Sequence, residues 1–167
     1  MSEKQIAPNL GLPGDESRLT LTRATGGITV LTDCELCEQD GGVVIFRNDF
    51  LRVVLVDDAD YPGFCRVICN AHISEMTDLG IAQRSQLMMT VCKVEQAVRD
   101  IMRPDKINLA SLGNMTPHLH WHIIPRHADD KHFPQPIWGT PQRDATRVAP
   151  VGWKKLLTDT LRARLET

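Results

Sequence analysis

The chain has 167 residues, a length that fits one domain with a proper hydrophobic core. Hydrophobic residues make up 42% and charged residues 24%, as in ordinary globular proteins. The formal net charge of -2 gives no global basic field, so nothing argues for nucleic acid or an anionic membrane as a partner.

Two further features of the composition bear on location. No apolar run approaches the ~20 residues that span a bilayer, and the first residues lack the apolar core of a signal peptide. Five cysteines are an odd number for a disulfide framework. We therefore expect a reducing cytoplasm, with residues 1–30 forming a mobile tail.

The first half of the chain predicts strands. Val43–Arg47 and Leu51–Val56 are rich in β-branched residues and are separated by a short turn, as in a hairpin. Phe64–Cys69 is a third apolar run of strand length, and it follows the turn-forming segment 57–63.

The hydrophobic period then changes to that of a helix. One apolar face recurs from Leu87 to Ile101, and Thr77 or Asp78 is a candidate cap for a helix that ends before Pro104. This stripe fits a core, and a subunit interface is the alternative.

Two more strands are expected at Lys106–Leu112 and His118–Pro125, and a short helix over Trp153–Leu165. The order of strands, helix, strands and helix predicts an α+β fold with a mainly antiparallel five-stranded sheet. We place the main domain at 31–139 and a C-terminal extension at 140–167.

Three histidines alternate in the last predicted strand. Strand geometry puts His118, His120 and His122 on one face, with Leu119, Trp121 and Ile123 on the other. Imidazole is a nucleophile, a general acid or base, or a metal ligand. An exposed polar sheet face and a cluster that only binds metal are the alternatives.

The triad and its neighbours resemble the histidine triad (HIT) family, whose pattern alternates His with apolar residues. The segment 106–126 is similar to the last two strands of that family, and the segments 67–72 and 76–79 are similar to its strand-to-helix connection. The resemblance covers roughly residues 33–139. It implies a HIT-like fold and a nucleotide hydrolase or nucleotidyl transferase that cleaves at the α-phosphate of a nucleotide conjugate.

The resemblance also assigns roles to residues. His120 corresponds to the nucleophile that forms a nucleotidyl-histidine intermediate, with its other nitrogen held by a backbone carbonyl. His122 corresponds to a phosphate or leaving-group contact, and His118 to an orienting residue or metal ligand. The nucleotide-binding positions correspond to Asp57 (with Asp58 as the alternative), Asn108, Gly113, Asn114 and Thr116.

This chain departs from the common family pattern at three positions. Asn114 stands where many members have Gln, Met115 where many have Ser, and Phe64 where one branch has a further histidine. Trp138 follows a proline-rich segment, either as a cover for the site or as an exposed anchor. His127 and His132 lie in a polar stretch and are expected to be exposed to solvent.

Cys34 and Cys37 form a C-x-x-C pair, which fits a zinc knuckle, a redox pair or two buried thiols. Some relatives, including galactose-1-phosphate uridylyltransferase, hold zinc with ligands that match Cys34, Cys37, His72 and His118. The resemblance thus implies a structural zinc, no cofactor for the chemistry itself, and a homodimer. A nucleotide-binding module with little turnover and a zinc-stabilised regulatory protein are the alternative functions.

Overall fold

The computed structural model describes residues 31–145 and 148–166, so the expected tail at 1–30 lies outside the described residues. Its centre is a five-stranded antiparallel sheet with the order β1-β2-β3-β5-β4. This confirms the predicted fold class. The strands are β1 (Val43–Arg47), β2 (Leu51–Leu55), β3 (Cys65–Cys69), β4 (Lys106–Ala110) and β5 (His120–Arg126).

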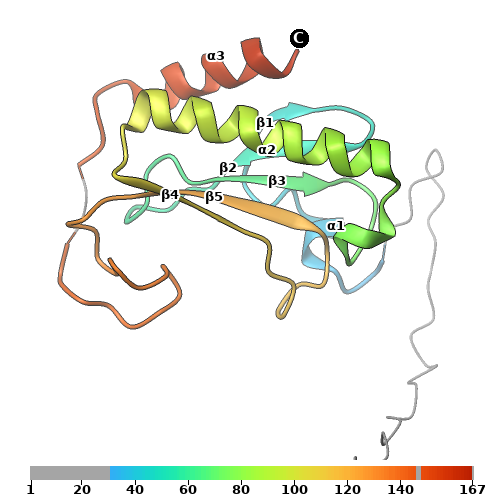
Figure 1. Cartoon of the computed structure of the whole chain (residues 1–167), viewed down its shortest axis with the longest axis horizontal. Coiled ribbons are helices and arrows are strands. Elements are labelled where there is room, and N and C mark those ends of the chain that lie inside the picture. Colours follow the sequence, from blue (N-terminus) through green and yellow to red (C-terminus); the bar gives the residue numbers. More distant parts are fainter. Residues whose placement is uncertain (1–30, 146–147, 167) are drawn as a thin grey trace, which may run out of the picture.

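Two longer helices cover one face of the sheet (Figure 1). They are α2 (Ile81–Met102) and α3 (Trp153–Leu165). The predicted start at Thr77 or Asp78 instead falls in a 3-10 turn, η1 (Met76–Asp78), and α2 begins after Gly80. The helix ends at Met102, and its C-cap residue, Arg103, adopts a left-handed φ of 47° before Pro104.

The main core lies between these helices and the sheet. Leu87, Val91, Val94 and Val98 of α2 are fully buried there, so the stripe is a core face. Leu157 and Leu161 of α3 are fully buried in the same cluster. The last helix therefore shares the core of the preceding residues.

The opposite face is covered at two places. A short helix that was not predicted, α1 (Glu35–Glu38), places Leu36 against Val54 and Ile68. Elsewhere on this face, Phe64 packs with Tyr61 and Ile124, and Ile137 joins them from the segment after β5. The histidine triad lies on this same face of the sheet, between α1 and the Phe64 cluster.

The segment after β5 is folded back by a buried ion pair. Arg126 donates through Nε and Nη2 to the two carboxylate oxygens of Asp130, at 2.6 and 3.0 Å. The backbone N–H groups of His132 and Phe133 also donate to Asp130, at 3.0 and 2.7 Å. These bonds give the segment a fixed path over the sheet.

The expectation that His127 and His132 are exposed is wrong. Both are buried, at 6% and 8% relative exposure. His132 Nδ1 lies 2.5 Å from the Tyr61 hydroxyl, and His127 Nδ1 lies 4.0 Å from a carboxylate oxygen of Asp105. Partners distant in sequence bury these rings, and a local polar composition cannot reveal them. In the part of the chain that the structure describes, no helix is long and apolar enough to cross a membrane.

Candidate active site

The residues of the triad segment alternate between the two faces of the sheet, as the sequence predicts for a strand. Leu119 and Ile123 enter the main core, whereas His120 and His122 lie on the other face, with ring centroids 4.6 Å apart. On the neighbouring strand β3, Arg66 pairs with His122 and Ile68 with His120. The strand register thus gathers two imidazoles and one guanidinium on one face of the sheet.

His120 is held in a single tautomer. Its Nδ1 lies 2.6 Å from the carbonyl oxygen of His118, so Nδ1–H donates and Nε2 carries the lone pair. Ser111 Oγ donates to the backbone carbonyl of His120 at 2.9 Å and fixes the strand at this point. The residue keeps 7% exposure, and its side-chain hydrogen bond within the described residues runs through Nδ1 and not through Nε2. A neutral imidazole nitrogen with its lone pair can act as a nucleophile or accept a hydrogen bond.

His122 sits in an aromatic setting. Its ring contacts Phe64 at a centroid distance of 5.6 Å and Trp138 at 5.0 Å. Its Nδ1 is buried without a hydrogen-bond partner. The favoured neutral tautomer therefore carries the proton on Nε2, because a buried N–H without an acceptor costs more than a buried lone pair.

Both imidazoles are neutral near pH 7. Burial lowers the pKa of His120, and the positive charge of Arg66 adds to this effect against the hydrogen bond to His118. Burial lowers the pKa of His122 to about 3, and the positive charges of a protonated His120 and of Arg66 add to this effect. Neutrality leaves a nucleophilic lone pair on one ring and an N–H donor on the next.

Two cysteines and two histidines form a second cluster beside the triad. Ligand atoms of Cys34, Cys37, His72 and His118 all lie within 4.8 Å of one another. His118 Nδ1 is 3.5 Å from both sulfur atoms, and His72 Nδ1 is 3.4 Å from Cys37 Sγ. The residues come from three separate segments of the chain.

The spacing of this cluster fits a tetrahedral zinc ion. Bond lengths of about 2.3 Å to sulfur and 2.0–2.1 Å to nitrogen place tetrahedral N and S ligands about 3.5 Å apart. His118 Nε2 lies 2.7 Å from the Cys69 carbonyl, and burial lowers the pKa of this ring to about 4, so Nδ1 faces the sulfurs with its lone pair. Four protein ligands would leave no open position, as in structural zinc sites.

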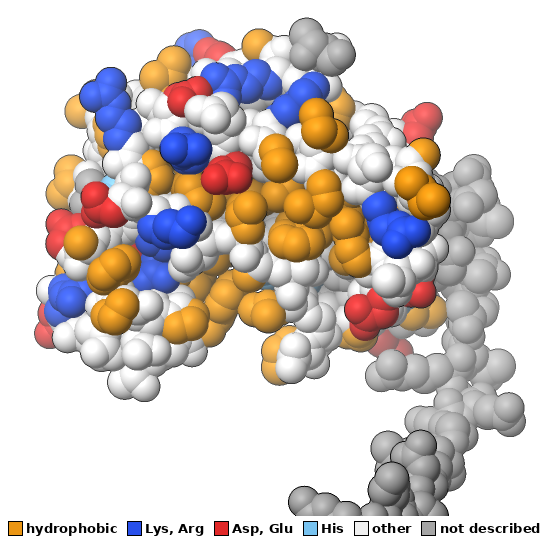
Figure 2. Space-filling view, in the orientation of Figure 1, with side chains coloured by type: hydrophobic (Ala, Val, Ile, Leu, Met, Phe, Trp, Pro, Cys, Tyr) orange, Lys and Arg blue, Asp and Glu red, His pale blue; other side chains and the backbone are white. Residues whose placement is uncertain are grey.

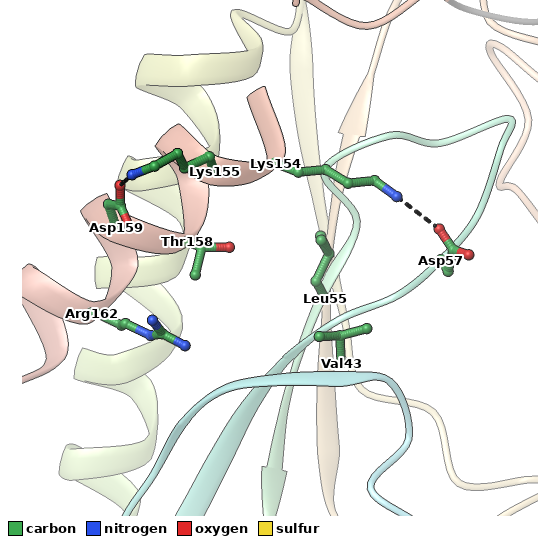
Figure 3. Close-up of a pocket in the computed structure, with 8 residues that line it drawn as sticks. All are labelled: Val43, Leu55, Asp57, Lys154, Lys155, Thr158, Asp159 and Arg162. Atoms are coloured by element: carbon green, nitrogen blue, oxygen red, sulfur yellow. Dashed lines mark hydrogen bonds and ion pairs between the residues drawn. The ribbon is translucent and has the colours of Figure 1, made fainter. Parts of the chain in front are cut away.

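The structure does not bring Asp57 to the triad. Its side chain is 85% exposed and pairs with Lys154 of α3 at 3.1 Å, in a pocket beside that helix (Figure 3). The neighbouring residue Val56 packs instead with Phe64, on the triad face. Alternation after the end of β2 thus turns Asp57 toward the helical side of the sheet. The alternative residue, Asp58, accepts hydrogen bonds at its carboxylate from the backbone N–H groups of residues 60 and 61.

The other expected nucleotide-binding residues divide into two groups. Asn108 lies in β4, where its side-chain oxygen accepts a hydrogen bond from Arg126 at 2.7 Å. Gly113 and Asn114 are exposed and line a pocket of about 370 Å³ that also reaches His118. Thr116 is in the same loop, and its carbonyl accepts the His118 N–H at 2.8 Å.

Two arginines on this face, Arg66 and Arg52, are not indicated as functional by any motif in the sequence. Arg66 is one of several arginines in the chain, and only the pairing of β3 with β5 sets it beside the triad. Arg52 donates to the carbonyls of Leu36 and Gln39 at 2.6 and 3.2 Å, and so ties the cysteine segment to the sheet. Alternation along β2 and β3 places both residues opposite the core, which is the signal available from sequence.

The fold and the site together define the class of protein: a five-stranded antiparallel sheet that carries an alternating histidine triad on the face opposite its two longer helices. The chain matches the family described as the HIT domain over residues 38–129, and it belongs to that family. This confirms the resemblance seen in the sequence. The helix α3 lies beyond the matched residues although it shares the core.

Curated and solved relatives agree with this assignment. A protein of Mycobacterium tuberculosis named AP-4-A phosphorylase is 27% identical over 135 residues, which are 74% of this chain and 69% of that protein. A histidine triad protein from Bradyrhizobium japonicum is 29% identical with a TM-score of 0.62, over 75% of this chain and 91% of that one. A second one, from Sinorhizobium meliloti, is 24% identical with a TM-score of 0.63 over 83% and 99%, and shows the fold alone.

Proposed function

We propose that the protein is a nucleotide hydrolase or nucleotidyl transferase that works through a covalent nucleotidyl-His120 intermediate. The observation that carries the proposal is the hydrogen bond from His120 Nδ1 to the His118 carbonyl at 2.6 Å. It orients the ring, fixes the tautomer and leaves the lone pair on Nε2. These are the requirements for an imidazole that attacks phosphorus.

In the first step, His120 Nε2 forms a bond to the α-phosphorus while the bond from phosphorus to the leaving group breaks. His122 Nε2–H lies beside this centre as a hydrogen-bond donor to a phosphate or leaving-group oxygen. In the second step an oxygen of the acceptor forms a bond to phosphorus, and the P–N bond breaks with its electron pair returning to His120 Nε2. Where the acceptor is water, its proton passes to the solvent. One difficult substitution is thereby divided into two easier ones.

A pocket beside His122 offers room for the leaving group. Its volume is about 580 Å³, and its lining includes Ile124, Ala110 and Trp138. Ala110 is the cross-strand partner of His122, and the Trp138 ring contacts the His122 ring. A leaving group that departs past His122 would enter this pocket, which is large enough for a nucleoside-sized group.

The substrate class follows from the same arrangement. Nucleoside phosphoramidates, dinucleoside polyphosphates and nucleotide sugars all place a leaving group on a nucleotide α-phosphate. The mycobacterial relative named AP-4-A phosphorylase supports a dinucleoside polyphosphate, with inorganic phosphate as an acceptor beside water. Both acceptors regenerate the neutral imidazole.

The cysteine–histidine cluster supports a structural zinc that holds α1 against the sheet. His118 belongs to this cluster through Nδ1, and its carbonyl holds His120. The metal would therefore fix the backbone that orients the nucleophile without taking part in the chemical steps. We propose no other cofactor for the transfer of the nucleotidyl group to His120.

A homodimer is part of the proposal. Figure 2 shows hydrophobic side chains gathered across the middle of one face of the molecule. Exposed apolar residues on α2 and around the edge strand β4 include Met89, Leu109 and Leu112. An edge strand with apolar neighbours is a favourable surface for a second copy.

The experiment is a search for the intermediate. The protein is mixed with diadenosine tetraphosphate or with adenosine 5′-phosphoramidate, quenched in alkali, and digested for mass spectrometry. We expect an adenylyl adduct on His120, and turnover reduced at least about 1000-fold in His120→Asn, which keeps a donor for the His118 carbonyl. Turnover that persists in His120→Asn, or nucleotide binding without turnover in the intact protein, would contradict the enzyme.

A further inference from the structure

Two arginines of the central strands face the triad side of the sheet, and their surroundings differ. Arg52 donates its hydrogen bonds to other groups of the protein. Its guanidinium nitrogens reach the carbonyls of Leu36, Gln39, Asp40 and Cys69 and the side chain of Asn70. Arg52 therefore has a complete structural role.

Arg66 lacks such partners. Its single hydrogen bond in the described residues runs from Nη1 to the Gly41 carbonyl at 3.4 Å, and its Nε is buried without an acceptor. Burial lowers the pKa of this side chain, and the charge of Glu35, which is exposed on α1, opposes this effect without forming an ion pair. A half-buried cation without an ion pair is costly unless a ligand supplies the negative charge.

The position of Arg66 says where that ligand would lie. It is the direct cross-strand partner of His122, and its guanidinium carbon lies 5.5 Å from the centroid of the Phe64 ring. Phe64 also contacts the His122 ring. The aromatic ring thus holds the guanidinium beside the triad, in the way that arginine packs over aromatic faces.

We propose that Arg66 is a phosphate-binding residue of the active site, whose guanidinium receives the non-bridging oxygens of the phosphate held between His120 and His122. This inference rests on the proposed function and names a contact that the triad does not provide. Arg66 is the positive charge that the strand pairing places directly beside His122, where the phosphate would lie. Guanidinium donors match a pair of phosphate oxygens in geometry as well as in charge.

The test compares two probes that differ only in the phosphate. Adenosine 5′-monophosphate and adenosine are titrated by calorimetry into the zinc-replete wild-type protein and into Arg66→Gln. We expect Arg66→Gln to lose about tenfold or more in affinity for the monophosphate, with little change for adenosine. Arg99→Gln removes the same charge from the exposed end of α2, on the other side of the sheet, and is expected to bind as wild type.

Each other outcome has a definite meaning. Equal monophosphate affinity in wild type and Arg66→Gln would overturn the role of Arg66 and leave the nucleotidyl-histidine proposal standing. Equal losses for both probes would make Arg66 a structural residue and would also overturn the inference. A wild-type protein that prefers the monophosphate no more than adenosine would remove the phosphate site itself, and the proposed function with it.

A measurement on the unmutated protein covers the case in which Arg66→Gln does not fold. Phenylglyoxal modifies accessible arginines, and the modified positions are mapped by mass spectrometry. We expect the monophosphate, but not adenosine, to protect Arg66 while Arg99 reacts equally in both samples. Labelling of Arg66 that the monophosphate leaves unchanged would contradict the proposal.

Discussion

His118 Nε2 lies 2.7 Å from the carbonyl oxygen of Cys69, and this bond turns the other ring nitrogen toward two sulfur atoms. The same residue supplies the carbonyl that holds His120. The metal cluster and the proposed nucleophile therefore share one residue. A disturbance of the cluster is expected to reach the active site through His118.

The first prediction concerns zinc. We expect about one zinc ion per chain by elemental analysis, and its loss in Cys34→Ser, because four tetrahedral ligands are needed to hold the metal firmly. The melting temperature should fall by several degrees, and chelator should have the same effect on wild type. Cys92→Ser is the control, since Cys92 is exposed on α2 and lies outside the cluster. Full zinc content in Cys34→Ser would contradict the assignment.

The second prediction concerns the buried pair of Arg126 and Asp130. Removal of one partner from a buried ion pair leaves an uncompensated charge, so Asp130→Ala should cost about 3–5 kcal/mol in the free energy of unfolding. Asp159→Ala breaks the exposed pair with Lys155 and should cost less than about 1 kcal/mol. Denaturant titrations measure both. Equal costs would show that the pair does not secure this segment.

The second prediction extends to pH, because the carboxylate of Asp130 should make the free energy of unfolding depend on pH. Burial of Asp130 raises its pKa, but hydrogen bonds from Arg126 and backbone N–H groups outweigh this and lower it to about 2. An unfolded aspartate titrates near ~3.9, so this stabilisation is complete above that value and is lost as the pH falls toward 2. The loss should amount to about 2–3 kcal/mol, and it should be absent from Asp130→Asn. Denaturant titrations at several pH values test the difference.

The third prediction concerns Trp138, which is half-exposed against the His122 ring. Because this side chain lines the pocket proposed for the leaving group, Trp138→Ala should act according to leaving-group size. We expect kcat/KM for diadenosine tetraphosphate to fall about tenfold, since an aromatic contact with a base is worth about 1–3 kcal/mol. Adenosine 5′-phosphoramidate, with its small leaving group, should be affected little. An equal fall for both substrates would place the large leaving group elsewhere.

The fourth prediction concerns the last helix. Leu157 is fully buried in the core that α2 and the sheet share, while its neighbour Leu156 is 56% exposed. Leu157→Ala should therefore destabilise the protein by about 2–5 kcal/mol, whereas Leu156→Ala should change little. Both are compared by denaturant unfolding. A small effect of Leu157→Ala would show that α3 contributes little to the domain.

Local patterns in the sequence are enough for much of the fold and the centre of the site. The period of two in residues 118–123 sets His120 and His122 opposite Leu119 and Ile123, and β5 realises this pattern because side chains alternate along any strand. The period of the helix stripe likewise determines α2, and α3 forms over the range Trp153–Leu165 in which a short helix is expected. These features depend on neighbours in the chain.

Other features depend on partners far away in the chain. The four-residue helix α1 is too short to be stable by propensity, and it exists because Leu36 packs on Ile68 and Arg52 binds the Leu36 carbonyl. His132 is buried because Tyr61 lies 71 positions earlier, and no local composition encodes that contact.

Sequence alone therefore determined which strand carries the histidines, because alternation and helical periodicity are short-range consequences of backbone geometry. Only the tertiary structure decided that Asp57 faces Lys154 and that Arg66, unlike Arg52, retains free donors beside His122. The reason is physical: a charged side chain is the same group at every position, and its role is set by the partners and the burial that long-range packing gives it.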